Sequence, residues 1–375
     1  MKKLILFAGI LIICSSCREL SEQKPPIQNL AKATIANGFR YKSYAKHTLL
    51  DIVNPWDTTR HLARFVLVKR GQVSDEIKNL QREIIEVPIT SAVISNTAQA
   101  ENMLRLGGLE QIVGAFDATY LLHKEIKARI QQQKISDLGP SSHINQEQII
   151  ALRPNVIFTS PYENQKAQKT KLINTHLLPY LDYMEDSPLG QVEWIKVIGL
   201  LLDQSVRADS LFEVTKTRYN QLKGLSSTSK NLPSVFSEIK TGSSWYISGG
   251  ESYIAQMYKD AGANYIFSEL THSGAKPFAE EWVFSQAQKA DFWLIKHHQN
   301  NLKDLKDLEQ IDPIYAAFDA FNKEQVFLCN TSQKTYYEEI SLYPDRLLSD
   351  LIAIFHPDLL PNHQFYYFQQ LQHPQ

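Results

Sequence analysis

Apolar residues recur at helical spacing over residues 187–224, the longest such pattern in the chain. Ser187 followed by Pro188 is a typical helix start, because a hydroxyl can cap free backbone amides and proline lacks a donor that would go unused there. Gly224 ends the pattern. The polar residues 203–205 interrupt it, so we expect either one helix or two, the second about 27 Å long. Such a helix is either an ordinary core helix or a connection between two lobes.

Similar motifs lie on both sides of this helical segment. Residues 103–113 have the pattern of a helix, a glycine that ends it and a strand, and residues 257–267 repeat the pattern at the same offsets. Residues 147–158 predict a helix led by a glutamate and then a buried strand, which residues 281–295 echo with a small insertion. Chance similarity of βα units is the alternative, but two motifs in the same order favour duplicated lobes.

These patterns predict an α/β protein: two α/β lobes joined by a single long helix, with a ligand cleft between the lobes. The predicted N-terminal lobe covers residues 31–186, the connecting helical segment residues 187–224 and the C-terminal lobe residues 225–375. Short alternating patterns between residues 34 and 70 indicate an antiparallel addition at one edge of the first sheet. We expect the parallel part of that sheet to begin at Ile84.

The first residues have the pattern of an export signal. Two lysines precede an apolar run over residues 4–13, which is about half of the roughly 20 residues needed to span a bilayer. We therefore expect a signal peptide over residues 1–16 and a polar tether over residues 17–30.

The apolar run ends in Cys14-Ser15-Ser16-Cys17, which resembles a bacterial lipobox, where a small residue precedes the cysteine that is lipidated. Cys17 fits better than Cys14, which follows the bulky Ile13; two incidental cysteines in a cleaved signal are the alternative. With Cys17 modified, Cys329 would be the one other cysteine of the mature chain, so no disulfide is expected.

Composition and motifs exclude several function classes. The chain has 375 residues with a net charge of -1 and lacks a basic stripe, so we expect no nucleic-acid partner. Gly-x-Ser-x-Gly, His-Glu-x-x-His and paired Cys-x-x-Cys motifs are absent, so no catalytic residue and no cofactor are predicted. Eleven histidines, among them His143, His272, His297 and His298, raise a zinc alternative, but adjacent histidines after a strand more often face solvent or cap a helix.

Polar and aromatic residues follow several predicted strands. Ser95, Asn96 and Thr97 end one strand and precede a helix, which places free backbone amides where open α/β sheets bind ligands. Ser248 begins a glycine-rich turn before another helix. Aromatic side chains suit a large, flat or partly apolar ligand, although core packing is the alternative for each of them. The aromatic residues expected to line the cleft are Phe116, Tyr120, Tyr162, Trp245, Tyr246 and Phe278.

Several segments together resemble the solute-binding proteins of ABC importers for cobalamin and ferric siderophores. They are the signal and lipobox, residues 147–157, the Ser-Gly-Gly-x-Ser-Tyr turn at residues 248–253, and residues 260–265. Residues 356–361 and Tyr366-Tyr367 resemble the lipoprotein branch of that family in Bacteroidetes. Asn155 departs from the aspartate that usually follows the proline, and the cleft tryptophans of cobalamin binders have no clear equivalents beside Ser141 and Ala275, which leaves the ligand open.

The resemblance implies a monomer that is lipid-anchored in the cell envelope, faces the periplasm and passes its ligand to an ABC permease dimer with its ATPase. The ligand would be an iron-siderophore or corrinoid chelate, with haem or a bare metal ion as alternatives. Glu147 and Glu281 match the pair of glutamates, one per lobe, that meets arginines on the permease; charge pairing with the helix N-terminus is the alternative. A secreted enzyme on this scaffold and a surface adhesin are the other function classes considered.

Overall fold

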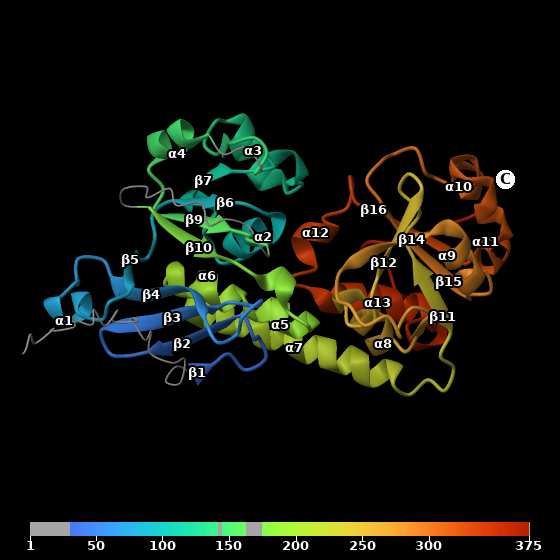
Figure 1. Cartoon of the computed structure of the whole chain (residues 1–375), viewed down its shortest axis with the longest axis horizontal. Coiled ribbons are helices and arrows are strands. Elements are labelled where there is room, and N and C mark those ends of the chain that lie inside the picture. Colours follow the sequence, from blue (N-terminus) through green and yellow to red (C-terminus); the bar gives the residue numbers. More distant parts are fainter. Residues whose placement is uncertain (1–30, 142–144, 163–174, 375) are drawn as a thin grey trace, which may run out of the picture.

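Two α/β lobes lie side by side along the long axis of the molecule, and helix α7 (Ser205–Ser226) passes from one to the other (Figure 1). The computed structural model describes residues 31–141, 145–162 and 175–374. The expected signal peptide, the tether, Cys17 and His143 lie outside these residues. Within them, no helix combines the length and the apolar character needed to cross a bilayer.

The first lobe is built on a five-stranded sheet of order β10-β9-β6-β7-β8, in which all strands are parallel. Helices follow most of its strands, as the alternation of β and α patterns predicts. Its elements are β6 (Ala92–Ile94), α2 (Thr97–Arg105), η1 (Leu109–Gln111), β7 (Ile112–Ala115), η2 (Ala118–Tyr120), α3 (Lys124–Gln131), β8 (Ser136–Asp137), α4 (Gln146–Leu152), β9 (Val156–Thr159), β10 (His176–Pro179) and η3 (Asp182–Met184).

The second lobe has a sheet of order β13-β11-β15-β16-β17, parallel except for its last strand. Its elements are β11 (Ser234–Ser237), α8 (Tyr253–Asp260), β13 (Asn264–Tyr265), α9 (Glu280–Ala287), β15 (Phe292–His297), α10 (Leu305–Ile311), η4 (Pro313–Ala317), α11 (Asp319–Asn322), β16 (Val326–Asn330), α12 (Tyr336–Glu339), α13 (Pro344–Phe355), η5 (Pro357–Leu359) and β17 (Gln369–Leu371).

The internal repeat recognised in the sequence is visible in the strand orders. The run β7-β6-β9-β10 of the first sheet has the same connectivity as β13-β11-β15-β16 of the second. Gly107 after α2 and Gly262 after α8 both have positive φ angles, 78° and 76°, which side chains other than glycine rarely adopt. The expected glycine ends of the two matching helices are therefore confirmed.

The N-terminal β-region is a separate sheet, which corrects the expectation of an addition at one edge of the first sheet. Its order is β1-β2-β3-β4-β5, and the first four strands are antiparallel to one another. Ile84 lies in its last strand, which pairs parallel with β4, so the parallel sheet of the lobe begins only at β6. The strands are β1 (Ala31–Lys32), β2 (Phe39–Ser43), β3 (His47–Val53), β4 (His61–Lys69) and β5 (Glu83–Val87), with α1 (Asp75–Lys78) before β5.

One face of this N-terminal sheet joins the core of the first lobe. Phe39, Leu50 and Phe65 are fully buried and belong to the same apolar cluster as β6 and the helices that follow. Side chains alternate across each strand, so the neighbours of these residues along the chain point to the opposite face. Asp51, which follows Leu50, is one of them. The sheet is therefore fixed to the lobe on one side only.

The predicted connecting segment 187–224 consists of three helices, α5 (Pro188–Glu193), α6 (Ile195–Leu201) and α7. Residues 202–204 separate α6 from α7, close to the polar interruption expected at 203–205, and a further break at Trp194 makes three helices where one or two were expected. Both short helices have buried residues in the first core, although Leu189 of α5 also packs against the second, and α7 is the helix that passes from one core to the other. Its residue Phe212 is buried in the first core and Tyr219 in the second, and its 22 residues span about 33 Å.

A two-stranded antiparallel sheet of β12 (Ser244–Ser248) and β14 (Ala275–Ala279) stands beside the second lobe. The sequence pattern does not predict this pairing. Gly250, after β12, has no room for a side chain, because a Cβ atom there would lie 1.8 Å from the backbone oxygen of Ser268. Glycine in this turn therefore serves close packing of two loops.

Candidate functional site

A cavity of about 790 Å³ lies between the two lobes, and we call it the first chamber. Its lining includes residues that directly follow four parallel strands: Ser95 after β6, Phe116 after β7, His298 after β15 and Thr331 after β16. The carboxyl ends of parallel strands are where open α/β sheets bind ligands. The two sheets therefore present their ligand-binding edges to the same space.

Hydrogen bonds hold the polar wall that the first lobe contributes. The side-chain amide of Asn96 donates to Ser160 Oγ at 3.1 Å, and its oxygen accepts the Gln99 backbone N–H at 2.9 Å as the N-cap of α2. Ser95 donates its backbone N–H to Gln99 Oε1 at 2.7 Å. Fixed hydrogen-bonding groups lose little entropy when a ligand binds.

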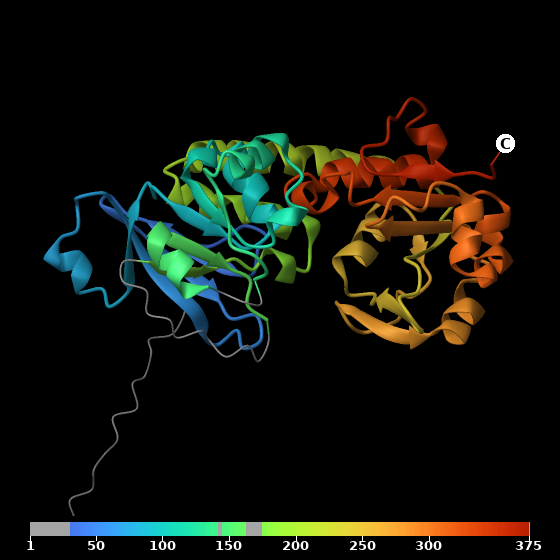
Figure 2. The ribbon, with the colours of Figure 1, turned by 90° about the horizontal axis from the view of Figure 1, so that it is seen from above.

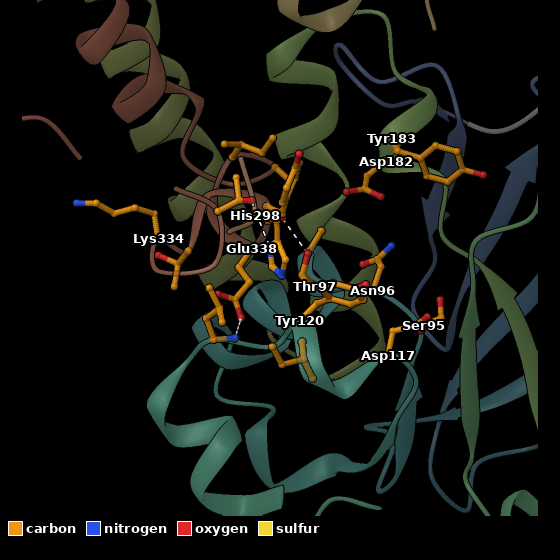
Figure 3. A pocket seen from close by; sticks show the side chains of 18 of the residues that line it. Ser95, Asn96, Thr97, Asp117, Tyr120, Asp182, Tyr183, His298, Lys334 and Glu338 are labelled. Atoms are coloured by element: carbon orange, nitrogen blue, oxygen red, sulfur yellow. Dashed lines mark hydrogen bonds between the residues drawn. The ribbon is translucent and has the colours of Figure 1, made fainter. Parts of the chain in front are cut away.

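Two contacts join the lobes around the chamber. Thr97 Oγ1 of the first lobe donates to the backbone oxygen of Tyr337 in the second at 2.9 Å. The rings of Tyr120 and His298 lie 5.6 Å apart, although 54% of the Tyr120 residue surface is exposed. Figure 3 shows Ser95, Asn96, Asp182 and Tyr183 on one side of the chamber and His298, Lys334 and Glu338 on the other.

The buried carboxylate of Glu338 also bridges the lobes. It comes from α12, which lies between the lobes in Figure 1. Its Oε1 atom accepts the backbone N–H groups of Leu122 at 2.6 Å and His123 at 3.3 Å. Burial raises the pKa of this carboxyl, and the nearby His123 and the two amides lower it only in part.

Asp182 is the most strongly perturbed carboxyl of the first chamber. It is 3% exposed, and its Oδ1 atom has no hydrogen-bond partner among the described residues. Burial raises its pKa from 3.8 to about 7, against a lowering by the backbone amide of Tyr183, and the charge of Glu185 adds to the rise. Near neutral pH this carboxyl can therefore be protonated and donate a hydrogen bond into the cavity.

Two lysines contribute positive charge. Lys296 forms an ion pair with Glu238 within the second lobe, and that carboxylate outweighs the effect of burial and raises the Lys296 pKa. Lys334 is exposed, and its side-chain ammonium forms no hydrogen bond or ion pair with any described residue, whereas its backbone N–H donates to the Asn330 oxygen. It is the lining lysine whose charge is available to a ligand.

A second chamber of about 760 Å³ adjoins the first, with which it shares Tyr183, Lys296, Tyr337 and Ile340. One wall comes from the N-terminal sheet and the loops at its end. The opposite wall comes from the second lobe, including Ser248 and Gly274. The interlobe cleft is therefore longer than the first chamber alone.

The structure brings together six of the residues expected to bind ligand. Five of them line the first chamber: Ser95, Asn96, Thr97, Phe116 and Tyr120. Ser248 lines the second chamber. Phe116 is only 4% exposed, so it offers a small surface. A role of these residues in binding stays a prediction.

The expectation that Trp245 lines the cleft is wrong. Trp245 lies in β12, where side chains alternate, so Trp245 and Ile247 are buried while Tyr246 between them is 47% exposed. The indole nitrogen of Trp245 donates to the backbone oxygen of Ser237 at 3.2 Å, and its ring packs against Phe236. Trp245 is therefore a core residue of the second lobe.

Three further aromatic residues lie away from the lining of both chambers. Tyr246 faces outward from β12, and Tyr162 is 65% exposed. Phe278 pairs with Trp245 across β12 and β14 and stacks on Trp282 at 4.6 Å. Their expected place in the cleft rests on positions after strands or just before helices, and the pairing of β12 with β14 puts Tyr246 and Phe278 outside the cleft.

Other lining residues were not selected from the sequence: Asp182, Lys296, His298, Lys334 and Glu338. His298 has a signal in the sequence, because it follows a strand, although the paired histidines there suggest only a zinc alternative. Glu338 and Lys334 reach the chamber through the packing of the last part of the chain against the first lobe, which no local pattern reveals. No group of three or more His, Cys, Asp or Glu side chains is placed to hold a metal ion in the described ranges.

Glu147 and Glu281 occupy matching places in the two lobes, in the first turns of α4 and α9. Both are exposed. Figure 2 shows both helices on the side of the lobes that faces away from α7. Their positions fit either a shared docking surface or favourable charge at helix N-termini.

Comparison with known proteins adds to this geometry. The family model described as periplasmic binding protein matches residues 93–332. An uncharacterised lipoprotein of Methanocaldococcus jannaschii is 26% identical over 409 residues, which cover 98% of this chain and 96% of that protein.

Solved structures share the fold. A TroA-like periplasmic binding protein, FepB, from Veillonella parvula has a TM-score of 0.59 at 16% identity, covering 76% of this chain and 96% of that one. A structure described as an ABC-type Fe³⁺-hydroxamate transport system, from Saccharomonospora viridis, has a TM-score of 0.56 at 19% identity, covering 72% and 94%. At such identities the likeness is one of fold.

Proposed function

This chain belongs to the periplasmic binding protein family, and from that membership we propose that it is the solute-binding component of an ABC importer. The observation that carries the proposal is the first chamber. Strand-end residues of both lobes converge on one cavity, whose volume of about 790 Å³ lies within the range of small-molecule sites. The permease dimer with its ATPase would be the partner that receives the ligand.

The ligand we propose is a metal chelate, either an iron-siderophore or a corrinoid. The lining combines aromatic rings, hydroxyl and amide groups and an exposed lysine, which suit the edges of a large, partly apolar molecule with polar substituents. The related structure from Saccharomonospora viridis is described as belonging to Fe³⁺-hydroxamate transport, which supports an iron chelate. Haem is the alternative that the same groups could accommodate.

We further propose that the protein is lipid-anchored through Cys17 and faces the periplasm. The sequence Ser16-Cys17 after an apolar run supports this, as does the description of the archaeal relative as a lipoprotein. An anchored binding protein stays close to its permease, which raises its effective concentration there.

A binding screen tests the importer function. The mature chain from residue 18 would be titrated with ferric hydroxamates, ferric catecholates, corrinoids and haem in a calorimeter. One chelate class should bind with a Kd of about 1 μM or tighter, and Tyr120→Ala should weaken it while Tyr246→Ala, outside both chambers, does not. Absence of binding by all four classes, with unchanged uptake of each in cells that lack the gene, would contradict the proposal.

A further inference from the structure

The second chamber is walled partly by a region outside the family match, which begins at residue 93. Asn37 and Gly38 directly precede β2, Arg40 is its second residue, and Val53 is the last residue of β3. Gly38 cannot be replaced without a shift, because a Cβ atom there would lie 2.6 Å from the Trp194 ring. This end of the sheet is therefore held firmly beside the cleft.

Arg40 is the unsatisfied cation of this wall. Its Nε atom is buried without a hydrogen-bond partner, and the whole guanidinium forms no hydrogen bond or ion pair with a described residue. A guanidinium offers five donors in a planar fork, and the buried Nε–H of the half-buried Arg40 costs free energy while it is unpaired, which a bound acceptor would recover.

The neighbouring carboxylate does not neutralise Arg40. Asp51 lies opposite Arg40 on the next strand but is 2% exposed and already held by Arg82 and Arg64. Arg82 donates to both of its oxygens, and Arg64 Nε lies 3.6 Å from Oδ1. Asp51 thus has two guanidinium partners of its own, and Arg40 opposite it on the neighbouring strand adds a third positive charge, which leaves a local excess of positive charge beside the chamber.

The acids that line the second chamber do not supply a partner either. Glu185 is occupied, because it accepts the backbone N–H groups of Asn37 and Gly38 and the indole N–H of Trp194, each at 2.8 Å. Asp186 and Glu251 are exposed, where water and salt screen their charges. Lys296 on the far side of the chamber is paired with Glu238.

We propose that the second chamber is an anion subsite in which Arg40 binds a carboxylate group of the ligand held in the first chamber. This inference rests on the proposed solute-binding function. The two chambers share four lining residues, so one extended molecule can occupy both. Two parallel hydrogen bonds from the guanidinium fork to a carboxylate provide orientation as well as affinity. The N-terminal sheet thereby adds selectivity for anionic chelates to the interlobe cleft.

Citrate alone tests the subsite without any assumption about the chelate. Thermal unfolding of wild type, Arg40→Gln and Arg64→Gln would be followed in millimolar citrate and in sodium chloride of the same ionic strength. Arg64→Gln is the matched control, because Arg64 lies in the same cross-strand row but does not line the chamber. Citrate should raise the Tm of wild type and Arg64→Gln but not of Arg40→Gln. An equal rise in Arg40→Gln, or none in wild type, overturns the subsite.

Chelates of different charge then test the Arg40 subsite separately from the importer function. Ferric citrate should bind wild type about 10- to 100-fold more tightly than Arg40→Gln, the loss expected for charge-assisted hydrogen bonds, while ferrichrome, which lacks carboxylates, should not distinguish the two proteins. Arg40→Lys should lie between them for ferric citrate, because it keeps the charge but loses the fork. If ferric citrate binds wild type and Arg40→Gln with the same affinity, the subsite proposal is wrong and the importer function is unaffected. An Arg40-dependent citrate effect without binding by any of the four chelate classes assigns the subsite to a free carboxylate anion and contradicts the proposed chelate ligand.

Discussion

His123 Nε2 lies 2.5 Å from a carboxylate oxygen of Glu101 in a buried pair at the junction of the two lobes. Glu101 is fully buried on α2, and Glu338 approaches the same histidine backbone from the second lobe. Burial alone would lower the His123 pKa, but the hydrogen bond and the charge of Glu101 outweigh it and raise the pKa above 6.5. Because the pair lies where the lobes meet, its protonation is linked to the stability of that junction.

His123→Gln is expected to lower the free energy of unfolding mainly under mildly acidic conditions. A histidine whose pKa is raised by folding contributes stability below 6.5, and this is lost as pH rises through its folded pKa. Glu101 has a lowered pKa, so its contribution is present above 4.5 and is lost as pH falls. The difference between wild type and variant in urea unfolding should therefore be largest between pH 4.5 and 6.5. A difference that grows from pH 7 to 9 would contradict the pairing.

Asp182→Asn should stabilise the unliganded protein at alkaline pH. Folding raises the pKa of this carboxyl from 3.8 to about 7, so stability is lost as pH rises through that range. Each pKa unit corresponds to about 1.4 kcal/mol, so the variant should gain up to a few kcal/mol at pH 8 and little at pH 4. Denaturant unfolding at both pH values measures this. A variant that is less stable than wild type at pH 8 would show that the carboxylate is satisfied when charged.

The sequence predicted the repeated lobes well because buried parallel strands, capped helices and glycine helix ends each leave a local pattern. Asn96 is an example, since a cap before a helix and a position after a strand can both be recognised in sequence. Glu338 could not be found in this way, because it reaches the chamber by packing of the chain end against a lobe more than 200 residues earlier. The expected cleft position of Trp245 is wrong because its segment is a strand that pairs with β14. Which face of that strand is buried depends on this pairing and cannot be predicted from the local sequence.

Trp245→Ala should destabilise the second lobe, whereas Tyr246→Ala should not. Trp245 is fully buried among aromatic rings, and removal of such a side chain costs about 3–5 kcal/mol, since the cavity refills only in part. Tyr246 is its matched control on the same strand, pointing to the opposite face. Thermal and urea unfolding of both variants test this. Unchanged stability of Trp245→Ala, together with loss of ligand binding, would restore a role for Trp245 in the cleft.

Cys17→Ser should release the protein from the membrane. Acyl chains add about 0.8 kcal/mol of membrane affinity for each buried CH₂, so the two or three chains of a bacterial lipoprotein anchor it firmly. Cell fractionation and mass spectrometry of the mature N-terminus measure the outcome, with Cys14→Ser as the control. Retention of the Cys17→Ser protein together with release of the Cys14→Ser protein would assign the anchor to Cys14.

Glu147 and Glu281 should act in delivery of the ligand and not in its capture. They are exposed, they lie in equivalent first turns of α4 and α9, and neither lines a chamber. Each carboxylate would meet a cationic side chain of the permease dimer, one per subunit. If the two carboxylates only stabilised the N-termini of their helices, each would contribute about 0.3–1 kcal/mol to the free energy of unfolding and nothing to transport.

Charge reversal at both positions separates these roles. Glu147→Arg with Glu281→Arg places like charges against the permease, which costs more than loss of an exposed ion pair worth about 0–1 kcal/mol. Ligand affinity in the purified protein should stay within about twofold of wild type, while uptake by cells should fall, and more in the double variant than in either single one. Glu280→Arg is a control on the same helix turn, since Glu280 is engaged by Lys240. Normal uptake by the double variant, or a loss matched by Glu280→Arg, would mean that the two glutamates do not form the docking pair.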